Sequence, residues 1–147
     1  MHVREQIMSA VVAAITGLPT TGARVLYDAA YAITDLPALA VMWSEDDTED
    51  VDGGLGDGPV ATRALKFNVT GRAKIGDGVP SVLGTIAAEV EIAVMTSAAV
   101  AALVHLIEYT SSTIAVSTEL EQPAGEVSVG FSALYRVKID DPETVIS

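Results

Sequence analysis

Apolar side chains recur at intervals of three and four residues along two segments of the chain. The first covers residues 2–16 and ends where Gly17 interrupts the pattern. The second follows Pro80, which suits the first turn of a helix, and runs to about Thr96. Because this spacing gathers apolar side chains on one face of a helix, the pattern predicts two amphipathic helices.

Other segments show the patterns of β-strands. Strict alternation of apolar and polar residues covers Val60–Lys74 and, most clearly, Val127–Ile139. Residues 106–120 are rich in β-branched and aromatic side chains, and Ala23–Tyr27 is a short candidate. Ala38–Trp43 is almost continuously apolar, so we expect a central strand that is buried on both faces.

The order of these segments predicts the fold class. A helix, two or three strands, a helix and a final pair of strands are typical of an α+β domain. We expect a mixed or antiparallel sheet with two main helices packed on one face, a short third helix near Ala98–Val104, and a long C-terminal β-hairpin joined by a turn at residues 122–125. The 147 residues suffice for a single domain, 1–147, with a loose C-terminal tail at residues 140–147.

Residues 44–59 change character abruptly, because acids and glycines replace the apolar residues. We expect an exposed, mobile acidic loop there. The candidate functional acids of this loop are Glu45, Asp46, Asp47, Glu49, Asp50, Asp52 and Asp57. A calcium loop read from Asp46 fails, since Val51 occupies the glycine position and Asp57 the position of the final glutamate.

The charge and the amino-acid composition of the chain exclude several classes of protein. Twenty acids against eight Lys and Arg give a formal charge of −12, which disfavours binding to nucleic acid and to anionic membranes. The chain has no cysteine, its longest apolar stretch, Ala98–Ile107, is too short to span a membrane, and its start lacks a signal-peptide pattern. We therefore expect the protein to stay where it is made.

The sequence offers few groups for catalysis. His2 lies in a terminus that we expect to be mobile, and His105 lies in an apolar run typical of a core or interface histidine. Neither has a Ser or Asp partner at the spacing of a known catalytic motif. We expect no enzyme, no catalytic, cofactor-binding or metal-binding residues, and no cofactor.

Half of the basic residues fall on one predicted strand. Arg63, Lys66, Arg72 and Lys74 all lie within residues 60–74, and the last three share one face of an unbroken strand. We consider two interpretations: a solvated strand face, or a surface that meets the acidic loop of a second copy.

Several short segments of the sequence resemble those of one protein family. They are His2–Ile7 at the start of the first helix, Gly17–Val25, Asp35–Val41, Glu119–Gly125 and Ala133–Val137. Together these segments and their layout are similar to the tail terminator (minor tail protein U-like) family of long-tailed bacteriophages. The likeness covers nearly the whole chain, and residues 45–59 match least.

The resemblance implies a structural protein of the virion. Members of this family assemble into a ring, commonly a hexamer, at the head-proximal end of the tail tube, where the ring ends tube polymerisation and offers the surface for head attachment. The implied partners are further copies of the chain, the tail tube protein and a head-completion or connector protein, with DNA passing through unbound and no membrane involved. The implied location is the virion tail, after assembly in the host cytoplasm.

On this interpretation, Arg63, Lys66, Arg72 and Lys74 are candidate ring-interface residues. The acidic loop becomes a candidate for lining the lumen or docking a basic partner, because acids repel passing DNA. Two alternatives stay open: another neck component, such as a head-completion or connector-adaptor protein, and a bacterial domain that binds a small molecule.

Overall fold

The protein is described by a computed structural model that covers residues 1–27, 36–53, 58–74, 76, 78–117 and 124–146. These residues form six strands and three helices. In chain order they are α1 (Val3–Ile15), β1 (Val25–Tyr27), β2 (Ala38–Asp52), β3 (Val60–Lys74), α2 (Val79–Thr96), α3 (Ala98–Ala101), β4 (Leu106–Ser117), β5 (Ala124–Lys138) and β6 (Asp141–Val145).

The strands form one mixed sheet in the order β1-β2-β3-β5-β4. Only β1 and β2 run parallel, and the other neighbours are antiparallel. The two shortest strands, β1 and β6, each lie beside a longer strand at one end of the sheet. β1 pairs with residues 39–41 of β2, whereas β6 pairs with the last residues of β5. Much of β2 on one edge and all of β4 on the other are left without a further strand in the described part of the chain.

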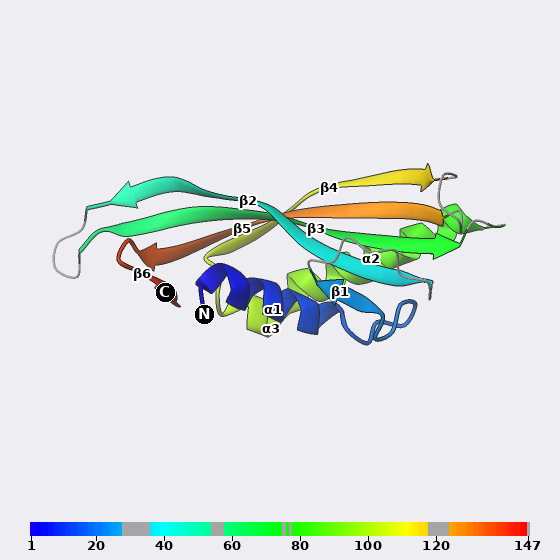
Figure 1. Cartoon of the computed structure of the whole chain (residues 1–147), viewed down its shortest axis with the longest axis horizontal. Helices are drawn as coiled ribbons and strands as arrows, with labels where there is room; N and C mark the ends of the chain where they lie inside the picture. Colours follow the sequence, from blue (N-terminus) through cyan, green and yellow to red (C-terminus); the bar gives the residue numbers. More distant parts are fainter. Residues whose placement is uncertain (28–35, 54–57, 75, 77, 118–123, 147) are drawn as a thin grey trace.

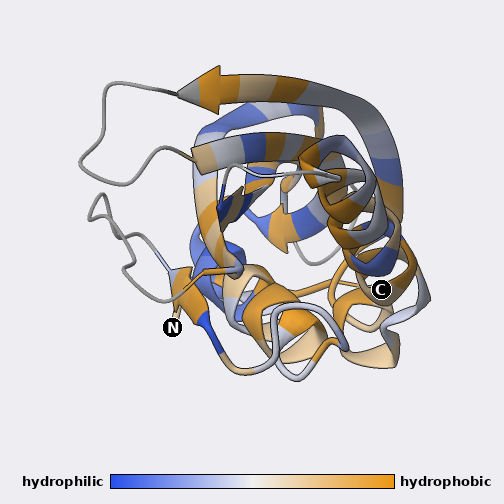
Figure 2. Cartoon of the chain, turned by 90° about the vertical axis from the view of Figure 1, so that its right-hand side faces the viewer, coloured by the Kyte–Doolittle hydropathy of each residue, from blue (hydrophilic) through white to orange (hydrophobic). Residues whose placement is uncertain are grey.

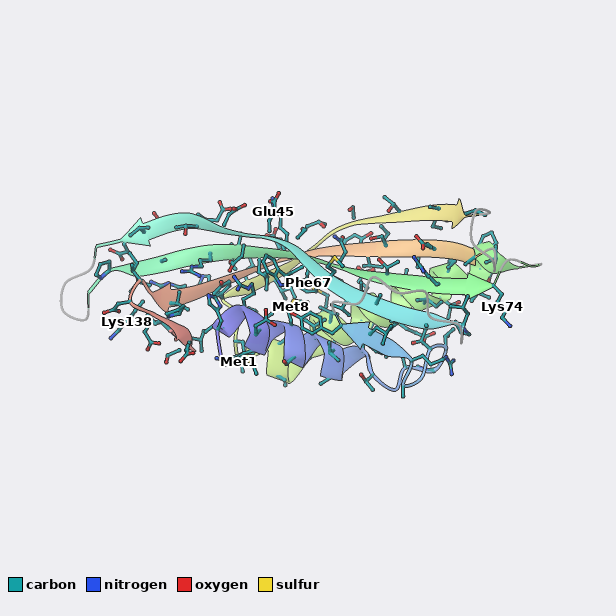
Figure 3. All side chains as sticks on the ribbon, in the orientation of Figure 1. Met1, Met8, Glu45, Phe67, Lys74 and Lys138 are labelled. Atoms are coloured by element: carbon teal, nitrogen blue, oxygen red, sulfur yellow. The ribbon has the colours of Figure 1, made fainter. Side chains whose placement is uncertain are left out.

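The helices lie together on one side of this curled sheet (Figure 1). Side chains at odd-numbered positions of β3 and β5 face them and are buried, as the alternation predicts. Phe67 and Phe131 stack there with ring centroids 5.2 Å apart. Figure 3 shows Phe67 and Met8 of α1 on the helix side of the sheet, with Glu45 on the opposite side. We call these two sides the helix face and the free face.

The α+β class with a mixed sheet is confirmed, and so are both main helices and the strand at residues 60–74. α1 begins and ends within one residue of the predicted bounds, and α2 begins one residue before Pro80. α3 is shorter than predicted. β4 and β5 pair antiparallel as expected of a hairpin, but residues 118–123, which hold most of the predicted turn, lie outside the described residues.

The structure corrects three expectations about exposed segments. Residues 44–52 are not a loop but the second half of β2, which pairs with β3 as far as Asp52 and Val60. Residues 140–147 are not simply a loose tail, because Asp141–Val145 forms β6. Ala38–Trp43 is not buried on both faces, because β2 has helices on one side only and Met42 is exposed on the other.

Backbone pairing explains why the acidic segment is extended. Each pairing with β3 satisfies backbone groups whatever side chains β2 carries, and β3 is a long strand anchored in the core. Bulges after Trp43 and Thr48 shift the register twice along this segment. The bulges change which acidic side chains of β2 face the helices. The alternation of residues in the sequence does not predict where such bulges occur.

The N-terminus of the chain contacts β6. The Met1 ammonium group lies 3.3 Å from a carboxylate oxygen of Glu143, and the Gln6 side chain donates to the Glu143 carbonyl. These contacts connect the start of α1 to the last strand. Figure 1 shows the N-terminus near β6.

Gly71 of β3 lies directly against Ile86 of α2. A Cβ atom at this position would lie 2.5 Å from Cγ2 of Ile86. We expect Gly71→Ala to lower the free energy of unfolding by about 1–3 kcal/mol through overpacking. Urea denaturation measures this change. The control is Gly84→Ala on the exposed face of α2, where a Cβ meets nothing within 4 Å. There we expect a gain of about 0.5–1 kcal/mol from helix propensity, and equal effects at both sites would contradict the packing argument.

Candidate functional site

The predicted acidic residues separate onto two faces of the sheet. Asp46 points to the helix face, and its side chain is only 5% exposed. Glu45, Asp47 and Asp50 point to the free face, as their pairing with even-numbered β3 residues shows. Glu49 lies at the second bulge. Asp52 ends the strand, and Asp57 lies outside the described residues.

Three of the four predicted interface cations have an acidic partner within the chain. Lys66 lies 3.2 Å from Glu45, its neighbour across β2 and β3, and Arg72 pairs with Glu126 across β3 and β5. Arg63 turns to the helix face and approaches Asp46. Lys74, at the end of β3, has no ion pair with any described residue. The predicted shared face of Lys66, Arg72 and Lys74 is confirmed by their register.

Asp46 is the centre of a polar cluster between α1 and the sheet. Its carboxylate accepts a hydrogen bond from the Tyr135 hydroxyl at 2.7 Å and one from Nη1 of Arg4 at 3.0 Å. Nη1 of Arg63 lies 3.9 Å away from the same carboxylate. The Arg4 guanidinium also lies 4.5 Å from the ring centroid of Trp43. One carboxylate therefore links β2 to α1, β3 and β5.

His2 connects this cluster to the start of α1. Its Nδ1 accepts a hydrogen bond from the backbone N–H of Arg4 and so caps the helix. Its Nε2 lies 3.1 Å from Nη1 of Arg63. Burial, followed by the nearby Arg4 and Arg63 charges, lowers the pKa of His2 below its ordinary 6.5. The expectation that His2 lies in a mobile terminus is therefore wrong.

Tyr135 contributes a proton donor to the cluster and takes no charge itself. Burial and its hydrogen bond to Asp46 both raise the pKa of the Tyr135 hydroxyl far above its ordinary value. The hydroxyl is thus neutral and donates to the carboxylate. The Asp46 carboxylate thus binds Arg4 of α1 and the neutral hydroxyl of Tyr135 on β5. This arrangement is suited to fixing α1 on the sheet.

A second arrangement lies on the free face, where β2, β3, β5 and β6 extend beyond α1 (Figure 1). Asp50 is opposite Thr62, and Thr62 is opposite Arg136 of β5. Two strand spacings, about 10 Å, therefore separate the backbone of this acid from the backbone of this base. Asp47 and Lys138 extend the two rows along their strands. Within the described residues, none of these four side chains has an ion pair.

The other predicted features have simpler environments. His105 is exposed just before β4, so it does not lie in the core, and its place in an interface stays a prediction. No group of three or more potential metal ligands occurs among the described residues. α2 is long and apolar enough to cross a membrane by length and composition, although a core helix can pass the same test and Leu83, Ile86 and Val90 of α2 are buried in the core.

Comparison with known proteins adds no family assignment. The sequence matches no protein-family model and no curated protein.

The sequence reasoning missed most of the Asp46 cluster. Nothing in the run from Glu45 to Asp52 distinguishes Asp46 from its neighbours, because the bulge after Trp43 selects the acid that turns inward. The basic row on β5 was also missed. Its signal was present, since Arg136 and Lys138 occupy even positions of the clearest alternating strand.

The Asp46 cluster predicts a large difference between two adjacent acids. Asp46→Asn removes the buried carboxylate that pairs with Arg4 and should lower the free energy of unfolding by about 3 kcal/mol. Asp47→Asn removes the same charge from an exposed position and should change it by less than about 0.5 kcal/mol. Chemical denaturation of the two variants checks this. Similar losses in both would show that Asp46 does not anchor α1.

The lowered pKa of His2 predicts a pH dependence of stability. The unfolded chain binds a proton at His2 near pH 6.5, whereas the folded chain binds it only at lower pH. Stability should therefore be complete above pH 6.5 and decline as the pH falls toward the lower folded value. His2→Asn keeps a capping side chain that does not titrate. We expect this variant to lose less stability than the parent between pH 7 and pH 5, measured by denaturant titration, and parallel profiles would refute the assignment.

Proposed function

We propose that this chain is a structural subunit of a phage virion that forms a ring at the head-proximal end of the tail tube. The ring ends polymerisation of the tube and presents a surface for the head-completion or connector protein. The proposal starts from the resemblance of the sequence to tail terminators. It includes no enzymatic activity and no cofactor.

The observation that carries the proposal is the pair of charge rows on the free face. Asp47 and Asp50 on β2, and Arg136 and Lys138 on β5, are complementary in sign and form no ion pair with each other or with another described residue. Between copies, the acidic row of one subunit can meet the basic row of the next. Such a contact joins two different surfaces, and repetition with rotation closes a ring.

These rows replace the interface expected from the sequence. Lys66 and Arg72 already have partners within the chain, so they are less suited to hold a neighbour. The rows lie on the part of the sheet that extends past α1, where a second subunit can approach without meeting the helices (Figure 1). Figure 3 places Lys138 at this end and Lys74 at the other end of the sheet.

The overall charge supports the same role. Each subunit carries a formal charge of −12, so a ring of several copies repels DNA that passes through its opening. The acids of β2 that remain outside the contact are suited to line that opening. In this proposal DNA moves through the ring without being bound, and the subunits join the tail after synthesis in the host cytoplasm.

Charge reversal on each row tests the proposal. Asp50→Lys places two bases at the contact between positions 50 and 136 of neighbouring subunits, and Arg136→Glu places two acids there, so each variant alone should fail to form rings and should leave tail tubes overlong. An equal mixture restores opposite charges at every contact of an alternating ring with an even number of subunits. We therefore expect the mixture to recover tubes of defined length, measured by negative-stain electron microscopy.

The control is Glu91→Lys on α2, which changes the net charge as Asp50→Lys does but lies outside both rows. It should form rings and end tubes like the parent. If Asp50→Lys and Arg136→Glu each end tubes normally, the charge rows do not form the contact. If the parent protein does not bind tail tubes but binds portal assemblies, it is another neck component.

A further inference from the structure

The outer edge of β4 is the longest regular strand edge that the described structure leaves open. β4 is a strand of twelve residues at the end of the sheet and pairs with β5 on one side only. An open edge exposes a row of backbone donors and acceptors that can accept another strand. Proteins commonly protect such edges with charged side chains or cover them.

β4 lacks that protection. Glu108 is its only charged residue, in a chain with 28 charged residues. Tyr109, Ile114 and Val116 are 40%, 57% and 59% exposed. All three point to the helix face, because they pair with the buried residues Phe131 and Val127 and with Gly125 of β5. Figure 2 shows apolar positions recurring along β4 at the rim of the molecule.

The other open edge is of a different kind. Beyond residue 41, β2 carries Asp47, Glu49 and Asp50 at exposed positions. Two β2 edges repel each other, and a β2 edge placed against β4 would set acids beside Ile114 and Val116 without a compensating base. A second β4 edge brings neither charge repulsion nor unpaired acids, so the best partner for the β4 edge is β4 of another copy.

We propose that two copies of this chain pair through β4 in an antiparallel, two-fold symmetric contact centred on Ser112. The bulge fixes this register. In the ladder with β5 the extra residue is Thr110, so side chains on the helix face are odd-numbered up to Tyr109 and even-numbered from Ser112. Pairing Ser112 with its own copy, with Thr110 again left out, keeps every helix-face residue opposite another.

This register matches the chemistry of the side chains. Ile114 lies opposite Tyr109 of the second copy, and Val116 lies opposite Ile107. Each pair joins an aliphatic residue to an aromatic or aliphatic one, a favourable combination across antiparallel strands. Glu108 lies opposite Ala115, which avoids contact between like charges. Symmetry repeats both apolar pairs, so four cover the exposed side chains of β4.

The contact responds to salt in a characteristic way. Each copy carries a charge of −12, so general repulsion opposes the dimer and added salt relieves it. Apolar pairing itself does not depend on screening. Dimerisation through β4 should therefore strengthen as salt is raised, whereas contact between the charge rows should weaken. The inference does not depend on the proposed ring.

Disulfide trapping tests the register, because the natural chain has no cysteine. Opposed residues in antiparallel strands have Cα atoms about 4.5–5.5 Å apart, within the reach of a disulfide. Ser112→Cys should form a covalent dimer under mild oxidation, seen on non-reducing gels. The matched control is Ser9→Cys, an exposed position on α1, which should stay monomeric under the same conditions.

Sedimentation equilibrium tests the contact without a cross-link. The parent should be dimeric at micromolar concentration in 0.5 M salt, and Ile114→Lys should raise its dissociation constant at least tenfold. Ile92→Lys changes an equally exposed isoleucine on α2 and should dimerise like the parent. A parent that stays monomeric, equal weakening by both variants, or equal cross-linking of Ser112→Cys and Ser9→Cys would overturn the proposal.

Discussion

The Asp46 carboxylate is the interaction on which the arrangement of α1 depends. It accepts hydrogen bonds from Arg4 at the start of the helix and from Tyr135 in the middle of β5. Its own strand is otherwise acidic and exposed at this end, so Asp46 is the acid of β2 that turns into the protein. Because the charge is almost fully removed from water, it is stable only while these partners stay in place.

This anchoring separates the molecule into two working parts. Over one part of the sheet, α1 and α2 cover the helix face and form a core of small aliphatic residues around Phe67 and Phe131. In the other part, the strands continue past α1, and Asp47, Asp50, Arg136 and Lys138 there have no ion pair with any described residue. The packed part holds the exposed strands in register, and the exposed strands present the charges to other molecules.

Alternation and helical spacing were sufficient to predict both main helices, the strand at residues 60–74 and the alternating core face of β5. They failed at β2, because a strand of acids has no hydrophobic pattern and is extended only through its pairing with β3. The inward turn of Asp46 depends on a bulge, and the capping role of His2 depends on contacts with Arg4 and Arg63. Such features arise from tertiary contacts, which local spacing does not encode.

The contact of the N-terminus with β6 has a mechanical consequence. A pulling force applied to Met1 and to Val145 would act on two segments that touch through Glu143. The last strand would then peel from β5 one residue at a time, because its connection to β5 is short and involves residues 136–138. The long ladders of β3 and β5 would bear little of this load at first, so early extension should detach β6 and leave the main sheet intact.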